Sequence, residues 1–189
     1  MPIATKIMIS KNESYPENIA DLLIYGDEVA KQILTQLTSS SCKKVGDLYN
    51  FINGKVTRNK KLFDELGYKA NESSEFKGLY IFGEEIDGSV IPVYVGISRS
   101  VYRRLRQHAW GKKHNECTLA YLKTRHRWKI EGKKTDRATI TDEDMLPAKS
   151  FIQNYKVVLV AIQNDYDLYF LEVLLAGKFK TKWNSFRTH

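Results

Sequence analysis

The chain of 189 residues is long enough for one medium domain, or for a small domain with an appendage. With 42% hydrophobic residues it can build a core, and no apolar run approaches the roughly 18 residues that span a membrane. Its N-terminus lacks the apolar segment of a secretory signal, and Cys42 and Cys117 lack zinc-ligand spacing. We therefore expect a cytoplasmic protein with two reduced thiols.

Positive charge is concentrated in one part of the chain. The net charge is +8, and residues 97–137 alone carry thirteen Lys or Arg against three Asp or Glu. By contrast, residues 1–75 hold ten bases and ten acids, and residues 138–189 hold six of each. A surface that served only solubility would intersperse acids among the bases. The concentrated segment therefore predicts a polyanion partner, with nucleic acid as the leading candidate.

The pattern of residues 1–75 predicts mainly helices. Residues 3–9 alternate weakly and favour a short strand, and residues 14–17 have the Pro and Glu typical of a helix start. A second helix is predicted over 45–52, closed by Asn53-Gly54, and a third over 60–66. The apolar stripe of the first helix is Ile19, Leu22, Leu23, Ala30, Ile33, Leu34 and Leu37.

We predict that residues 1–75 form a helical appendage, joined to the rest of the chain by a linker at 70–75. Such an appendage can bind DNA, mediate dimerisation or support the sheet. Its balanced charge favours support or dimerisation over DNA binding.

Residues 78–108 carry the strongest local signals. Apolar runs at 79–82 and 90–96 flank Asp87-Gly88, which predicts a hairpin because glycine supplies the positive φ of a tight turn. Pro92 cannot donate a ladder hydrogen bond, so its strand is expected to have an exposed edge or a bulge. The period then changes to that of a helix, with Ser98 or Ser100 as the N-cap.

This helix places Arg104 and His108 on the shoulder of an apolar stripe marked by Val101 and Leu105. A guanidinium in that position needs an anion to offset its desolvation. Alternatively it packs by its aliphatic stem and keeps its charged head in water. The spacing alone is equally compatible with both interpretations.

Residues 111–150 form a predicted basic insert with a helix over 118–128. Tyr121 and Trp128 are interleaved with the basic side chains of this helix, a mixture that suits contacts with phosphates and bases. The candidate nucleic-acid-binding residues are Arg99, Arg103, Arg106, Lys112, Lys113, Lys123, Arg125, Arg127, Lys129, Lys133, Lys134 and Arg137.

The last part of the chain predicts a strand and a helix. Residues 155–162 are largely apolar, which is typical of a strand buried on both faces. Asp165 or Asp167 is expected to cap a helix that runs to about residue 178.

Two acidic features accompany these elements. Glu172 lies beside the apolar stripe of the last helix, where a carboxylate is costly unless it is paired, for instance with Arg104, or bound to a metal. Residues 141–144 are interpreted as a helix cap rather than as a metal cluster, because they directly precede an apolar pair.

The sequence resembles the signature of the GIY-YIG nucleases. Gly78-Leu79-Tyr80 is followed after thirteen residues by Tyr94-Val95-Gly96, and then by Arg104 and His108. Members of this family carry a glutamate on a later helix and an asparagine beyond it, for which Glu172 and Asn184 are the candidates. Either tripeptide alone would be uninformative, whereas the ordered set is hard to obtain by chance. The resemblance covers residues 76–186.

The resemblance implies an α/β (α+β) fold in which a small mixed or antiparallel three-stranded sheet is flanked by helices. Residues 76–189 would form the nuclease domain, with the basic insert inside it. The implied catalytic residues are Tyr80, Tyr94, Arg104, His108, Glu172 and Asn184.

Each implied residue has an expected role. Glu172 would hold Mg²⁺, for which Mn²⁺ can substitute, and Arg104 would clamp phosphate oxygens. Asn184 would orient the metal shell or a substrate phosphate. Tyr80 is the candidate general base and His108 the alternative. Many family members carry Lys where this chain has Ile97. The absence of that Lys favours Tyr94 or His108 over Tyr80 as the general base.

The implied activity is hydrolysis of phosphodiester bonds in double-stranded DNA. The chain ends five residues after Asn184, without the downstream domains of homing and repair members, so we expect a compact, site-specific enzyme of the type II restriction kind. Such an enzyme would act as a homodimer on palindromic DNA. The alternatives are a structure-specific or nonspecific nuclease of repair or mobile elements, an RNA-directed nuclease, and a catalytically silent nucleic-acid-binding module.

Overall fold

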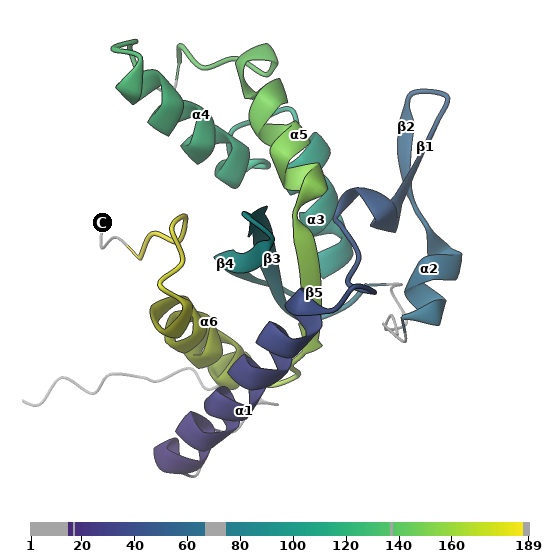
Figure 1. Cartoon of the computed structure of the whole chain (residues 1–189), viewed down its shortest axis with the longest axis vertical. Coiled ribbons are helices and arrows are strands. Elements are labelled where there is room, and N and C mark those ends of the chain that lie inside the picture. The colour runs from purple at the N-terminus through teal and green to yellow at the C-terminus, as the bar shows by residue number, and fades with distance from the viewer. Residues whose placement is uncertain (1–14, 17, 67–74, 137, 187–189) are drawn as a thin grey trace, which may run out of the picture.

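The computed structural model describes residues 15–186 except 17, 67–74 and 137. The described chain has an α+β fold, with a central sheet between two groups of helices (Figure 1). In chain order the elements are α1 (Ile19–Thr38), the 3-10 helix η1 (Gly46–Leu48), β1 (Tyr49–Ile52), β2 (Lys55–Arg58), α2 (Lys60–Glu65), β3 (Gly78–Ile86), β4 (Ser89–Ser98), α3 (Val101–Trp110), α4 (Thr118–Ile130), the 3-10 helix η2 (Glu143–Met145), α5 (Leu146–Asn154), β5 (Lys156–Ala161) and α6 (Asp165–Phe179).

The central sheet has the strand order β4-β3-β5, and both strand pairs are antiparallel. β3 and β4 form the predicted hairpin, in which Asp87 and Gly88 have φ values of 49° and 77°. The register shifts between Phe82 and Gly83, opposite Pro92, and β4 lies at the edge of the sheet. The expectation for Pro92 is confirmed, because a bulged edge strand tolerates the missing N–H.

One face of the sheet is covered by α1 and α6. Leu79 and Ile81 of β3 point to this face and pack in one buried cluster with Ile33 of α1 and Leu171 of α6. Gly26 lies where α1 meets α6, and a Cβ added there would lie 2.3 Å from Leu174 Cδ2. α1 therefore shares a core with the sheet.

The predicted stripe of α1 is partly wrong. Ile19, Leu23 and Leu34 are exposed, whereas Gly26 and Val29 are buried. The missing side chain of Gly26 allows the two helices to approach closely, which rotates the buried face away from the stripe that hydropathy alone selects.

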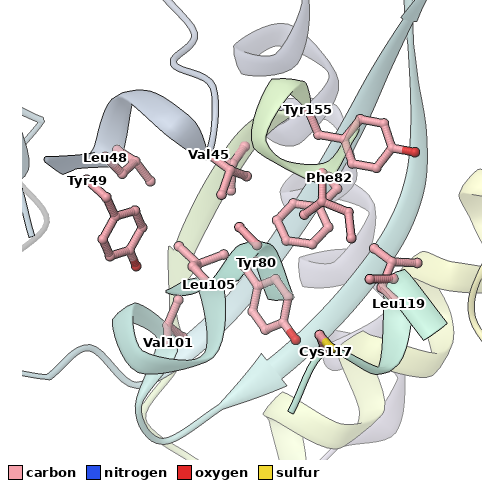
Figure 2. Packing of buried hydrophobic residues seen from close by; sticks show 14 of the residues in the cluster. Val45, Leu48, Tyr49, Tyr80, Phe82, Val101, Leu105, Cys117, Leu119 and Tyr155 are labelled. Atoms are coloured by element: carbon pink, nitrogen blue, oxygen red, sulfur yellow. The ribbon is translucent and has the colours of Figure 1, made fainter. Parts of the chain in front are cut away.

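The other face of the sheet is covered by α3, α4 and α5. Tyr80 and Phe82 point to this face, because they alternate with Leu79 and Ile81 along β3. Leu105 of α3 completes this cluster with buried residues of the other two helices. Figure 2 shows Phe82 beside Tyr155 in this core, with ring centroids 6.1 Å apart.

The helix predicted over 45–52 is wrong. After η1, strands β1 and β2 form a small antiparallel hairpin that projects from the body of the protein (Figure 1). Asn53 and Gly54 have φ values of 50° and 74°, so the dipeptide makes a hairpin turn rather than a helix end. The next predicted helix, over 60–66, is confirmed as α2.

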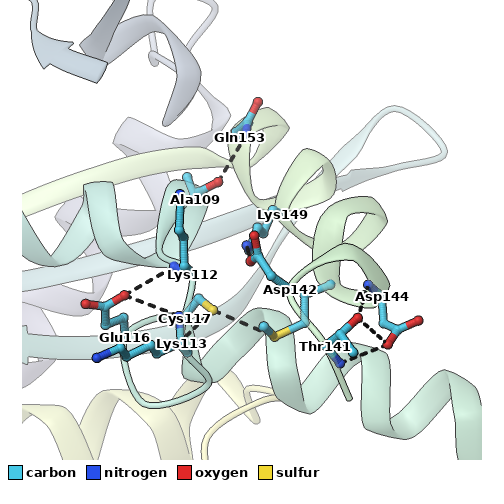
Figure 3. A network of polar contacts seen from close by, with 11 residues as sticks. Ala109, Lys112, Lys113, Glu116, Cys117, Thr141, Asp142, Asp144, Lys149 and Gln153 are labelled. Atoms are coloured by element: carbon cyan, nitrogen blue, oxygen red, sulfur yellow. Dashed lines mark hydrogen bonds and ion pairs between the residues drawn. The ribbon is translucent and has the colours of Figure 1, made fainter. Parts of the chain in front are cut away.

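The region between α3 and β5 is helical and is held by polar contacts (Figure 3). The helix predicted over 118–128 is confirmed as α4. Thr141 N and Oγ1 donate to Asp144 Oδ2 at 2.8 and 2.7 Å, as in the capping pair expected for residues 141–144. The ammonium of the buried Lys149 is paired with Asp142.

The strand and helix predicted near the end of the chain are confirmed as β5 and α6. The predicted strand at 3–9 and most of the linker at 70–75 lie outside the described residues. Among the described helices, none has both the length and the apolar composition needed to cross a bilayer.

Candidate functional site

The two tripeptides of the family signature meet across the β3–β4 ladder. Tyr80 lies opposite Gly96 in the register, and Phe82 lies opposite Tyr94. The ring of Tyr80 lies over Gly96, because a Cβ added at Gly96 would lie 2.3 Å from Tyr80 Cζ. Gly78 is equally restricted, since its Cβ would lie 2.1 Å from the carbonyl oxygen of Val160. Both glycines are thus required by close packing.

Tyr80 and His108 form a buried polar pair. Tyr80 Oη and His108 Nε2 share a hydrogen bond of 2.8 Å, and Nδ1 of the ring has no partner among the described residues. Burial raises the pKa of Tyr80 well above its ordinary value, although the charge of Arg104 opposes this. Burial, and then the charge of Arg104, lower the pKa of His108 well below its ordinary value. The pair is therefore neutral near pH 7.

Tyr94 adjoins this pair at a more open position. Its ring centroid lies 5.5 Å from that of His108 and 6.1 Å from that of Tyr80. Unlike the other two side chains, it is only half-buried. Burial raises the pKa of Tyr94, the charge of Arg104 lowers it, and the charge of Glu172 raises it. The charges of Arg104 and Glu172 thus act in opposite directions on the pKa of the same residue, Tyr94.

Arg104 comes from the half-buried shoulder of α3. Its Nη1 donates to the main-chain oxygen of Glu116 at 2.7 Å, which fixes the guanidinium beside the aromatic groups. The loop that holds Glu116 is itself tied down, since Glu116 Oε2 accepts from the main-chain nitrogens of Lys112 and Lys113 at 3.2 and 3.3 Å (Figure 3). The guanidinium is therefore neither a loose surface group nor paired with a carboxylate in the described chain.

Glu172 is placed by α6, whose leucines dock on the opposite face of the sheet. Asn164, and not Asp165 or Asp167 as predicted, caps this helix by accepting from Tyr166 N at 2.8 Å. Burial raises the pKa of Glu172 to about 7. Within the described residues its carboxylate has neither a hydrogen bond nor an ion pair, so the salt bridge with Arg104 considered above is not formed. A desolvated carboxylate without a cation of its own fits a divalent ion.

The expected metal site depends on the carboxylate of Glu172. Within residues 15–186, apart from the gaps given above, no three His, Cys, Asp or Glu side chains cluster as a metal-binding group. A single carboxylate still suits Mg²⁺, which retains several waters and accepts phosphate oxygens as further ligands.

Asn184 is engaged with the main chain of β4. Its Oδ1 accepts from Val95 N at 2.8 Å, and its Nδ2 donates to Val95 O at 2.7 Å. Thr181 Oγ1 donates to the same Oδ1 at 2.9 Å. Asn184 therefore pairs with the edge strand as another strand would, and holds the segment after α6 next to Tyr94.

Tyr80, Arg104, His108 and Asn184 thus lie together at Tyr94-Val95-Gly96, and the charge of Glu172 acts on Tyr94. No family model, curated protein or solved structure matches the chain. The likeness to the GIY-YIG nucleases accordingly rests on these residues and their arrangement.

The predicted nucleic-acid-binding residues fall into three groups. Arg103 and Arg106 of α3 are exposed, as are Lys112, Lys113, Arg125, Lys129 and Lys134. Four others interact within the protein: Arg99 with Asp165, Lys133 and Arg127 with Glu131, and Lys123 with Tyr155. Arg137 lies outside the described residues.

Sequence reasoning missed the groups that hold the site together. Glu116 acts through its main-chain oxygen and Thr181 through a hydroxyl in a loop, and neither residue type signals such a role. The steric role of Gly96 was detectable only as part of the signature, because the ring that it accommodates comes from another strand.

Proposed function

We propose that the protein is a metal-dependent endonuclease that hydrolyses phosphodiester bonds in double-stranded DNA, with the site specificity of a type II restriction enzyme. One observation carries the proposal: two phenols and a guanidinium lie together at residues 94–96, and the charge of a desolvated carboxylate acts on one of the phenols. Phosphodiester hydrolysis needs an activated water and neutralisation of the charge that develops at phosphorus. These side chains have the chemistry for both tasks.

Arg104 is assigned to the phosphate. Its guanidinium offers several N–H donors in a planar fork, which a lysine would not reproduce. The anchor on Glu116 O keeps this fork beside Tyr80 and Tyr94, so little side-chain freedom is lost when a phosphate binds. Arg104 therefore neutralises the non-bridging oxygens in the proposed mechanism.

Tyr94 is assigned to the attacking water. Tyr80 is buried, with 1% of its surface exposed, and is bonded to His108, whereas Tyr94 is partly exposed. The ring of Tyr94 packs against the neutral Tyr80–His108 pair. A divalent cation held by Glu172 would neutralise charge at the phosphate and would reverse the unfavourable field that Glu172 exerts on Tyr94.

A nicking assay tests the proposal. Supercoiled plasmid, linear duplex and RNA are each incubated with Mg²⁺ or with EDTA. The proteins are the wild type, Glu172→Gln, Tyr94→Phe and the control Glu85→Gln, which makes the same chemical change at an exposed position on β3. We expect Mg²⁺-dependent cutting at discrete plasmid sites by the wild type and the control. Each site variant should lose about 100-fold or more of this activity.

Other outcomes would select the alternatives. Random nicking would indicate a nonspecific or structure-directed nuclease, and cutting of RNA alone would indicate an RNA-directed enzyme. Tight DNA binding without any cutting, under all metal conditions, would overturn the proposal in favour of a silent binding module.

A further inference from the structure

A cavity of about 200 Å³ lies between α4, α5 and the segment after α6. Lys123 and Thr124 of α4, Phe151 of α5 and Trp183 form parts of its wall, and Glu84 of β3 closes one end. None of these five residues belongs to the catalytic set described above. The volume suits one planar ring system and is too small for a stacked pair of bases.

The cavity combines aromatic rings with positive charge. The Lys123 ammonium lies 4.7 Å from the centroid of Trp183 and 5.6 Å from that of Phe151. It also donates to Tyr155 Oη at 2.5 Å. The ammonium of Lys182, which is not part of the wall, lies 5.2 Å from the centroid of Trp183. A ligand here would meet aromatic surfaces and two positive charges, as bases and their flanking phosphates do on nucleic-acid-binding proteins.

Three polar atoms of the wall residues lack partners. Thr124 Oγ1, Arg127 Nε and Trp183 Nε1 are all buried, and among the described residues none of them makes a hydrogen bond. The nearest carboxylate oxygen to Arg127 Nε, on Glu131, is 3.7 Å away, which is too long for a hydrogen bond. These atoms have almost no exposed surface, so a ligand in the cavity would meet the aromatic rings and Lys123 rather than these three atoms.

The cavity is close to the proposed catalytic site. The Tyr155 ring, to which Lys123 donates, packs on Phe82, and Phe82 stacks on Tyr94 with centroids 5.9 Å apart. Trp183 directly precedes Asn184, and Trp183 N donates to the main-chain oxygen of Val93 at 3.2 Å. A nucleotide close to the phosphate at Tyr94 could therefore place its base in the cavity.

We propose that this cavity receives one unpaired base of the DNA substrate. The proposal rests on the DNA endonuclease activity proposed above. Every base offers a planar ring face, which Phe151 would stack against, and carbonyl or ring-nitrogen acceptors, to which Lys123 would donate. Extrusion of the base would resemble the way in which base-modifying enzymes take a base out of the stack.

Equilibrium binding in EDTA, measured by fluorescence anisotropy on labelled duplexes, tests the proposal. One duplex is fully paired, a second has a single bulged guanine, and a third has a single bulged thymine. We expect the wild type to bind the guanine-bulge duplex about tenfold more tightly than the paired one, since base–aromatic stacking is of at least this size. The thymine-bulge duplex should show a similar preference over the paired one, because stacking on aromatic side chains tolerates every base.

Matched variants locate the effect. Phe151 is 58% exposed and Lys123 is half-buried, so Phe151→Ala and Lys123→Met should fold and should lose the preference for bulged duplexes while still binding paired duplex. Lys129→Met and Ile130→Ala make similar changes on the outer surface of α4 and should keep it. Thermal melting of each variant confirms that it is folded.

The outcomes separate the two proposals. Equal wild-type affinity for all three duplexes, or a preference for the bulged duplexes that survives in both cavity variants, would overturn the base site and leave the nuclease proposal standing. Failure to bind any duplex in EDTA would also overturn the base site, whereas the nuclease proposal is decided by the nicking assay with Mg²⁺.

Discussion

The substitution Gly96→Ala tests the geometry on which the candidate site depends. The new Cβ would lie 2.3 Å from Cζ and 2.4 Å from Oη of Tyr80. The ring cannot move aside easily, because it is buried and lies against Phe82, Tyr94 and His108. Forcing an extra methyl group into such packing costs about 1–3 kcal/mol. Separating Tyr80 from His108 breaks a buried hydrogen bond, at a further cost of about 1–3 kcal/mol.

We therefore expect Gly96→Ala to lower the free energy of unfolding by at least about 2 kcal/mol. Urea denaturation followed by circular dichroism measures the change. The matched control is Gly177→Ala, since no atom lies within 4 Å of a Cβ at that helical position. The control should be neutral or stabilise by up to about 1 kcal/mol. If Gly96→Ala were within about 0.5 kcal/mol of the wild type, Tyr80 would not lie over Gly96 as described.

Three further predictions concern charge and the segment after α6. At pH 8, Glu172→Gln should raise the free energy of unfolding by up to about 3 kcal/mol, because a pKa raised from 4.5 to about 7 makes wild-type stability fall as pH rises between those values. Near pH 4, the variant and the wild type should have the same free energy of unfolding in urea titrations. Asn184→Ala should destabilise by about 1–3 kcal/mol and quicken hydrogen exchange of the Val95 amide, because both bonds to that residue are lost. Replacing either Arg103 or Arg106 by Gln should lower the slope of log affinity for duplex DNA against log salt by about 1, as expected for one phosphate contact each.

Controls accompany each of these predictions. Glu85→Gln should leave the pH dependence of stability unchanged. If Glu172→Gln also left it unchanged, the Glu172 carboxylate would not be buried without a partner as described. Asn184→Asp keeps an acceptor for Val95 N but places a carboxylate oxygen against Val95 O where the donor was, so it should lose at least as much stability as Asn184→Ala. A salt slope unaffected by either arginine would exclude the exposed face of α3 from the DNA contact.

Local sequence patterns were sufficient wherever a structural element depends on neighbouring residues. Asp87-Gly88 between two apolar runs predicted the β3–β4 hairpin, because turn chemistry and strand alternation act within a few residues. The same chemistry at Asn53-Gly54 was misinterpreted as a helix end, since the flanking strands have only four residues each and an alternating pattern that short is weak. The prediction of the buried face of α1 was wrong for a different reason. Gly26 lies on that face because α6 packs closely against it, and the sequence around Gly26 gives no sign of this contact.

By itself the sequence determined the order of the site residues, the hairpin that carries the two tyrosines, and the concentration of positive charge after it. Only the tertiary structure decided how those residues are used: Asn184 binds the edge strand, Lys123 lies among aromatic rings, and Glu172 has no ion pair within the described residues. The physical reason is that burial and partner choice depend on groups far apart in the chain. Periodicity gives the face on which a side chain lies, but the elements that fold against that face give it its partners and its charge.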